Sequence, residues 1–140
     1  MTTTASVVSD QQRQQFQDEG YMILEKIIPQ DMLDMLREEC HYFIGYKDAL
    51  MDDKQIESDG LNVRRNRYFI SGEYRKSVRL WRFIYSELMA DVATAALGDQ
   101  VYLFNEQWVV KGPEKGKPFA WHQDSGYIKH RDPGTQHKPY

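Results

Sequence analysis

The chain has 140 residues, of which 41% are hydrophobic and 13% aromatic, and its formal net charge is −3. This length and apolar content are sufficient for one packed domain and exclude a disordered chain. The mildly acidic balance disfavours a nucleic-acid-binding protein, which normally carries a basic excess on one face.

Neither a membrane span nor a secretory leader is predicted. No apolar stretch approaches the roughly 18 residues of a spanning helix, and residues 1–5 lack the basic and apolar runs of a signal peptide. A cytoplasmic location is therefore expected. The lone Cys40 cannot form an internal disulfide, and its place on an apolar helix face predicts a core residue.

The first part of the chain predicts a helix and then a strand. Ser9 is a suitable N-cap for a helix over 9–19, with Gln12 as its capping-box partner and Gly20 at the end. Residues 21–28 are mainly apolar, which favours a strand that ends at Pro29.

A second helix is expected from about Asp31 to Gly45, because apolar residues recur at steps of three and four along it. These residues are Met32, Leu33, Leu36, Cys40, Phe43 and Ile44. His41 falls within this helix and is read as a helix-surface or core residue. Residues 47–59 are polar, rich in acids and aperiodic, which predicts a solvated loop.

Three arginines, Arg64, Arg65 and Arg67, lie close together in the segment 61–70. Guanidinium groups bind carboxylates and phosphates through paired donors, so the cluster is a candidate anion site. The competing interpretation is that the three side chains are simply solvated.

Helical periodicity returns over 77–97 and ends at Gly98, and Ser86 with Glu87 offers an alternative start for a separate second helix. The most strand-like segment is 101–110, which is rich in β-branched and aromatic residues.

Alternation along this strand places polar side chains on a face that is expected to point inward. The face carries Leu103, Asn105, Gln107 and Val109. Because a polar group on a buried face needs a partner, Asn105 and Gln107 are candidates for contact with a neighbour, water or ligand.

The most informative motif is Trp121-His122-Gln123-Asp124, which follows a turn rich in glycine and proline at 112–118. The turn predicts a hairpin whose second strand carries the motif. On a strand, His122 and Asp124 point to the same side, roughly 6.5 Å apart along the backbone. An imidazole and a carboxylate, completed by a second imidazole, form the facial triad of non-heme Fe(II) oxygenases. The sequence therefore predicts a metal site at His122 and Asp124.

A zinc site built from His122, His130 and His137 is the main alternative. The two later histidines lie in cationic segments rich in glycine and proline, which are typical of exposed loops. Structural zinc sites also favour cysteine ligands at short spacings, and Cys40 is far upstream. The sequence contains neither a Gly-x-Ser-x-Gly nucleophile elbow nor a glycine-rich phosphate loop.

No internal repeat, low-complexity tract or domain boundary is found, so residues 1–140 are expected to form a single domain. Helices are predicted first and strands last. This order favours an α+β fold in which N-terminal helices support a sheet.

Four segments, in this order and spacing, resemble the N-terminal half of a phytanoyl-CoA dioxygenase-family protein, and together they cover nearly the whole chain. They are Phe16-x-x-x-Gly20-Tyr21, Leu33-x-x-Leu36-Arg37, Ala96-Leu97-Gly98-Asp99-Gln100-Val101 and Trp121-His122-Gln123-Asp124-Ser125.

The resemblance implies a double-stranded β-helix of the jelly-roll or cupin type, and an Fe(II)- and 2-oxoglutarate-dependent dioxygenase that hydroxylates a small organic substrate. It implies His122 and Asp124 as the first two iron ligands. It also implies that Gln107 contacts the cosubstrate 2-oxoglutarate and that Arg67 is a basic residue of the same pocket.

The resemblance further implies a third iron ligand and a cosubstrate-binding arginine far downstream, and His130 and His137 come too early for that ligand. A fragment or truncated product, inactive alone, is therefore expected. The alternative is a non-catalytic interaction module that keeps this half of the fold and whose exposed strand edges bind a partner chain. Neither nucleic acid nor a membrane is expected as a partner.

Overall fold

The polypeptide forms helices on one side of a small antiparallel sheet, which confirms the mixed α+β expectation. The computed structural model describes residues 6–112 and 121–122. The elements, in chain order, are α1 (Asp10–Glu19), α2 (Gln30–Asp53), β1 (Ser58–Asp59), β2 (Asn62–Val63), β3 (Arg67–Ser71), the 3-10 helix η1 (Glu73–Arg75), α3 (Val78–Ile84), α4 (Glu87–Leu97) and β4 (Gln107–Lys111).

Helix α1 begins and ends as predicted. The Ser9 hydroxyl accepts from the backbone N–H of Gln12, while the Gln12 side chain accepts from the backbone N–H of Ser9 at 2.9 Å. Gly20 adopts a left-handed conformation, φ 79°, and donates to the Phe16 carbonyl at 2.9 Å. A cap of this kind stabilises a helix by about 1 kcal/mol.

The strand predicted over residues 21–28 is wrong. This segment forms no strand ladder and turns at Glu25 and Lys26, where Lys26 has φ 55°. Met22 and Leu24 are nevertheless half-buried while Tyr21 and Ile23 are exposed. The apolar composition that suggested a strand therefore serves packing, and a strand also requires a neighbour with which to exchange hydrogen bonds.

Helix α2 continues past Gly45 to Asp53, so the predicted helix end and the loop over 47–53 are both wrong. A glycine inside a helix costs about 1 kcal/mol relative to alanine. Burial of Phe43 before it and Met51 after it offsets this cost, because both side chains lie in the main core.

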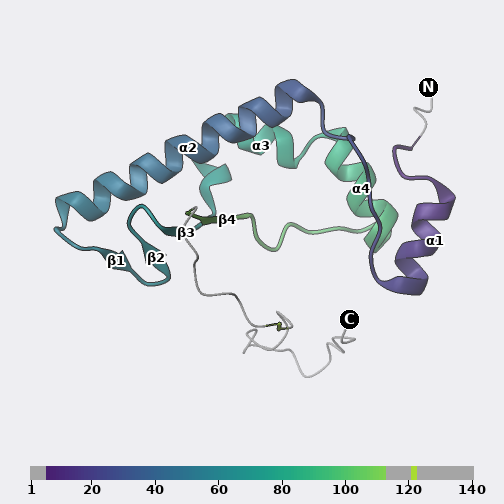
Figure 1. Cartoon of the computed structure of the whole chain (residues 1–140). Coiled ribbons are helices and arrows are strands. Elements are labelled where there is room, and N and C mark those ends of the chain that lie inside the picture. Colours follow the sequence, from purple (N-terminus) through teal and green to yellow (C-terminus); the bar gives the residue numbers. More distant parts are fainter. Residues whose placement is uncertain (1–5, 113–120, 123–140) are drawn as a thin grey trace.

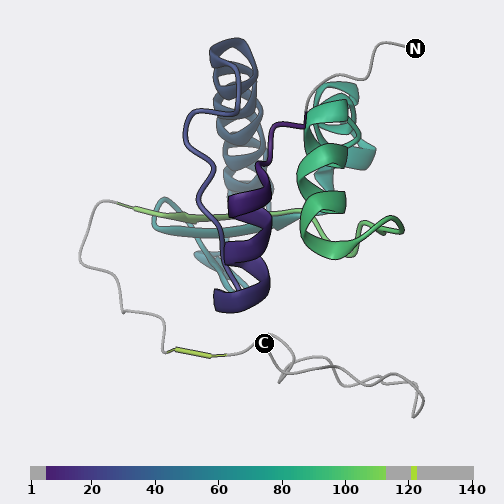
Figure 2. The same cartoon turned by 90° about the vertical axis from the view of Figure 1, so that its right-hand side faces the viewer.

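The four strands follow one another in the order β1-β2-β3-β4, and each neighbouring pair is antiparallel. Helices α2 and α3 lie over one face of this sheet (Figures 1 and 2). The core between sheet and helices consists of Phe43, Met51, Tyr68, Ile70 and Leu80.

The strand predicted over 101–110 forms only in its last four residues, and β4 extends one residue further, to Lys111. All five residues of β4 pair with β3, whose own five residues set the length of the ladder. Tyr102 and Phe104, which precede β4, are 83% and 85% exposed. Although both residue types favour strands, Tyr102 and Phe104 form none, because β3 does not extend opposite them.

The alternative of two helices after Ser77 is confirmed. Ser77 caps α3 and Ser86 caps α4, each accepting a backbone N–H three residues ahead. Gly98 ends α4 as predicted. None of the helices in the described ranges combines the length and apolar character needed to cross a membrane.

Two predictions on α2 are refined. Cys40, predicted as a core residue, is only half-buried and is not among the described residues that form or pack against the core; burial raises the pKa of its thiol, which favours the neutral form. His41 is an exposed residue of the helix surface.

Candidate functional site

The face of the β3–β4 ladder that points away from the helices is the candidate site, and we call it the open face. Side chains alternate along a strand, so the residues between those of the core point to the other side. The open face consists of Arg67, Phe69 and Ser71 from β3 and Gln107, Val109 and Lys111 from β4.

Register brings polar groups together at each end of the open face. Ser71 lies directly opposite Gln107 at one end, and Arg67 lies directly opposite Lys111 at the other. Between these pairs, Phe69 and Val109 form an apolar centre. The surface thus has two cations at one end, an apolar middle and an amide with a hydroxyl at the other end.

The side chain of Arg67 leans along the open face. Its guanidinium carbon is 5.9 Å from the centre of the Phe69 ring, and its Nε donates to the Leu61 carbonyl at 2.9 Å. Four residue steps separate Arg67 from the pair that contains Gln107, which is about 13 Å along the strands. The lean over Phe69 therefore directs the cation toward the middle of the face.

The expectation that Gln107 faces inward is wrong in the part of the chain that the structure describes. Gln107 and Val109 are exposed, whereas Trp108 and Val110 pack against the core. Pairing with β3 sets which face of β4 is buried, because Tyr68 and Ile70 are buried and lie opposite Val110 and Trp108. Asn105 is also exposed and precedes β4.

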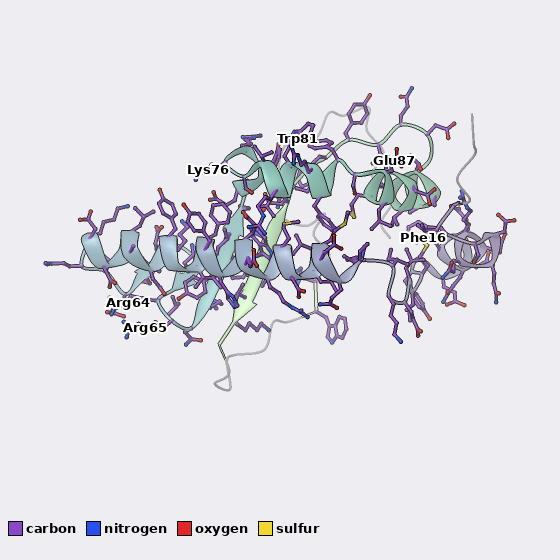
Figure 3. All side chains as sticks on the ribbon, turned by 90° about the horizontal axis from the view of Figure 1, so that it is seen from above. Phe16, Arg64, Arg65, Lys76, Trp81 and Glu87 are labelled. Carbon is purple, nitrogen blue, oxygen red and sulfur yellow. The ribbon has the colours of Figure 1, made fainter. Side chains whose placement is uncertain are left out.

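The three arginines do not form one anion site. Arg64 pairs with Asp52 on α2, and its Nε lies 3.9 Å from a carboxylate oxygen of Glu57. Arg65 adopts a left-handed conformation, φ 57°, in the turn between β2 and β3. Both lie at that turn, beside the C-terminal half of α2, on the other side of the helix from Trp81 (Figure 3). Only Arg67 belongs to the open face.

The turn that precedes Arg67 is anchored to α2 through Tyr68. The Tyr68 hydroxyl donates to Asp48 at 2.7 Å and accepts the backbone N–H of Arg65 at 2.6 Å. Burial raises the pKa of this phenol, and the hydrogen bond to Asp48 raises it further. A neutral Tyr68 therefore fixes the start of β3, and with it Arg67.

The close approach of Gly112 to the same turn fixes the end of β4. Its N–H donates to the Asn66 carbonyl at 2.5 Å, and a Cβ at this position would lie 3.1 Å from that oxygen. A larger residue where the chain leaves β4 toward the His-x-Asp motif would therefore require the Asn66 carbonyl to shift.

The predicted metal ligands fall at the edge of the described chain. Trp121 and His122 are described and lie in no strand, and the Trp121 side chain is fully exposed. Asp124, His130 and His137 lie outside the described residues, so the strand geometry predicted for the motif stays a prediction.

The donor types of the motif fit Fe(II), since imidazole nitrogen and carboxylate oxygen are its usual protein ligands. Among residues 6–112 and 121–122, no group of three or more histidine, cysteine, aspartate or glutamate side chains is placed to hold a metal ion. This part of the chain therefore offers no centre that competes with the motif.

Three open-face residues were not identified as site residues from the sequence: Phe69, Ser71 and Lys111. Alternation groups them with Arg67 or with Gln107, but only the register of β3 against β4 joins the two groups into one face.

Comparison with known proteins gives one family. The family model described as phytanoyl-CoA dioxygenase matches residues 16–138. No solved structure matches the chain significantly.

Curated relatives agree with this family. The ectoine dioxygenase of Sphingopyxis alaskensis is 29% identical over 87% of this chain and 39% of its own length. The ectoine dioxygenase of Bordetella bronchiseptica is 25% identical over 86% of this chain and 38% of its own length. The chain thus spans about two fifths of the length of these relatives.

Proposed function

Because the chain belongs to the phytanoyl-CoA dioxygenase family, we propose that it contributes to the active site of an Fe(II)- and 2-oxoglutarate-dependent dioxygenase that hydroxylates a small organic substrate. The observation that carries this proposal is the match over residues 16–138, which includes the His-x-Asp motif. The open face and the fit of the donor set to iron support it.

In this proposal His122 and Asp124 hold the metal. An imidazole and a carboxylate supply two of the three protein ligands of a facial triad and leave positions for other groups. When bound, Fe(II) supplies the activation of oxygen that no protein side chain can supply. His122 and Asp124 would be ligands and would take no part in proton transfer.

Gln107 and Arg67 are proposed to contact 2-oxoglutarate. The Gln107 amide donates hydrogen bonds without adding charge, and the Arg67 guanidinium pairs with a carboxylate. The apolar centre of the open face, Phe69 and Val109, would exclude water between them. A barrel of the jelly-roll type would cover this face and turn it into the wall of a pocket, which is our proposal for the complete fold.

The substrate is proposed from the relatives alone. The two proteins compared above are named for ectoine, so ectoine is the first compound to test.

Anaerobic calorimetry with 2-oxoglutarate tests the proposed function on this chain. We expect 2-oxoglutarate to bind only when Fe(II) is present, and this binding to be lost in His122→Ala. Binding that is the same with and without Fe(II) would contradict the proposed site. In the whole protein that carries the chain, succinate formation dependent on Fe(II) and ectoine measures the activity.

A further inference from the structure

A surface cavity of about 210 Å³ opens between the first turns of α2 and the short helix α3, on the helical side of the molecule. Its lining is made by Asp31, Met32 and Met35 from α2 and by Arg79, Arg82 and Phe83 from α3. Residues three or four positions apart share a helix face. Met35 lies at these spacings from Asp31 and Met32, and Arg79 lies at them from Arg82 and Phe83, so the three residues of each helix border the same side of it. None of these residues belongs to the open face.

An ion-pair contact holds the two helices around the cavity. Arg79 of α3 donates to Glu38 at 2.5 Å and pairs with Glu39 at 3.1 Å, both on α2. Leu80 also anchors α3, because its side chain is only 2% exposed and packs in the core. Trp81 points away from α2 (Figure 3), which leaves Arg82 and Phe83 toward the cavity. The spacing of α2 and α3 around the cavity is therefore fixed by these contacts.

Two charged groups of opposite sign line the cavity without partners in the described residues. Within residues 6–112 and 121–122, the side chains of Asp31 and Arg82 take part in no hydrogen bond or ion pair, and they do not pair with each other. Arg79 is different, since its guanidinium is engaged by Glu38 and Glu39. The free charges of the cavity are thus one carboxylate and one guanidinium.

The rest of the lining is apolar and adaptable. Met32, Met35 and Phe83 are half-buried, and the unbranched thioether side chains of methionine adjust to the shape of a ligand. The volume is below the roughly 300 Å³ at which sites for drug-sized ligands begin. It suits a molecule of about the size of an amino acid.

We propose that this cavity binds a small zwitterion with an apolar body, such as a free α-amino acid with an aromatic or aliphatic side chain. Its carboxylate pairs with Arg82, its ammonium group with Asp31, and its side chain contacts Met32, Met35 and Phe83. A simple anion would pair with Arg82 but would be repelled by Asp31. A simple cation would pair with Asp31 but would be repelled by Arg82. The site lies on the helical side and is independent of the dioxygenase proposal.

The probe for this site is 4-fluoro-L-phenylalanine, observed by fluorine NMR with the full chain. We expect saturable binding that is weakened about tenfold in Arg82→Gln and in Asp31→Asn, as the loss of a charge-assisted hydrogen bond predicts. Arg75→Gln removes an exposed arginine of η1 outside the cavity and should leave binding unchanged. 4-Fluorophenylacetate and 4-fluorophenethylamine each lack one charge and should bind more weakly than the amino acid.

A second readout comes from the protein. With methyl-labelled methionine, the Met32 and Met35 signals should shift as the probe is added, while the signal of Met51, which is 1% exposed in the core, should not. No saturable binding, equal binding by Arg82→Gln and the unsubstituted chain, or unmoved Met32 and Met35 signals would each overturn the proposal. Fe(II) is absent throughout, so failure here says nothing about the proposed oxygenase site.

Discussion

Arg67 and Gln107 lie on the same face of the β3–β4 ladder, at opposite ends of it. Arg67 pairs across the ladder with Lys111 and Gln107 pairs with Ser71, and the lean of Arg67 over Phe69 shortens the distance between the two functional groups. To contact both side chains, a five-carbon dicarboxylate would have to lie along the apolar centre of the face. The two residues are therefore expected to make separate contributions to its binding.

Removing the amide of Gln107 should weaken 2-oxoglutarate binding without unfolding the protein. The side chain is exposed, so Gln107→Leu should leave the free energy of unfolding nearly unchanged. Loss of one hydrogen bond to a charged group should raise the dissociation constant about tenfold, measured calorimetrically with Fe(II) present. Asn105→Leu, an exposed amide that precedes β4, is the control. The same loss in both variants would argue against a specific contact at Gln107.

Alkaline pH should destabilise the fold through Tyr68. Its pKa in the folded protein is raised above the ordinary value of about 10, first by burial and then by Asp48. The unfolded chain therefore loses this proton at a lower pH than the folded one, so stability is full below pH 10 and falls as pH rises through the folded pKa.

Tyr68→Phe should make the free energy of unfolding less dependent on pH above about 10, measured by urea denaturation. At neutral pH the same variant should lose about 1 kcal/mol, because Asp48 and the Arg65 N–H lose their shared partner. Tyr102→Phe is the matched control, since Tyr102 is 83% exposed. If the free energy of unfolding falls equally with alkaline pH in both variants, Tyr68 is not the cause of the alkaline destabilisation.

The helices predicted from the sequence are largely correct because their signals are local. Ser9, Ser86 and Gly20 act on the next or preceding turn, and their effects need no knowledge of the rest of the fold. The end of α2 was missed because Gly45 is a local signal that burial of Met51 overrides.

Strands were predicted less well because a strand depends on its partner. Residues 21–28 have strand composition but pair with no strand, and 101–106 precede the point where β3 begins to pair with β4. The same dependence hid which side of β4 the core covers, so Gln107 was expected on a buried face although that face is exposed in the described residues. The residue types of the candidate site could be identified from the sequence, whereas their arrangement could be known only from the register of β3 against β4.

Truncation of the core residue of α3 should be costly. Leu80 is 2% exposed, so Leu80→Ala should lower the free energy of unfolding by about 2–5 kcal/mol through lost burial and a residual cavity. Val78→Ala on the same helix removes a side chain that is 65% exposed and should change stability by less than about 0.5 kcal/mol. Chemical denaturation measures both, and similar losses would contradict the packing of α3 described above.

The N-terminal segment is held on α4 by one carboxylate. Asp91 accepts from the Ser6 hydroxyl at 3.0 Å and from the backbone N–H of Val7 at 2.6 Å, and Val8 beside them is 2% exposed. Asp91→Ala should therefore speed amide hydrogen exchange at residues 7 and 8 while exchange in β3 stays slow. Asp99→Ala, an exposed carboxylate beyond α4, should change neither. Unchanged exchange at Val7 in Asp91→Ala would show that this contact does not hold the segment.

Anaerobic titration of the chain with Co(II), followed by its visible absorption, tests whether His122 and Asp124 hold the metal. We expect weak binding, since two protein ligands leave the ion largely to water, and we expect His122→Ala and Asp124→Ala each to abolish it. His130→Ala and His137→Ala should leave the affinity unchanged. Binding that survives His122→Ala, or that is lost in His130→Ala or His137→Ala, would contradict the assignment of His122 and Asp124 as the ligands.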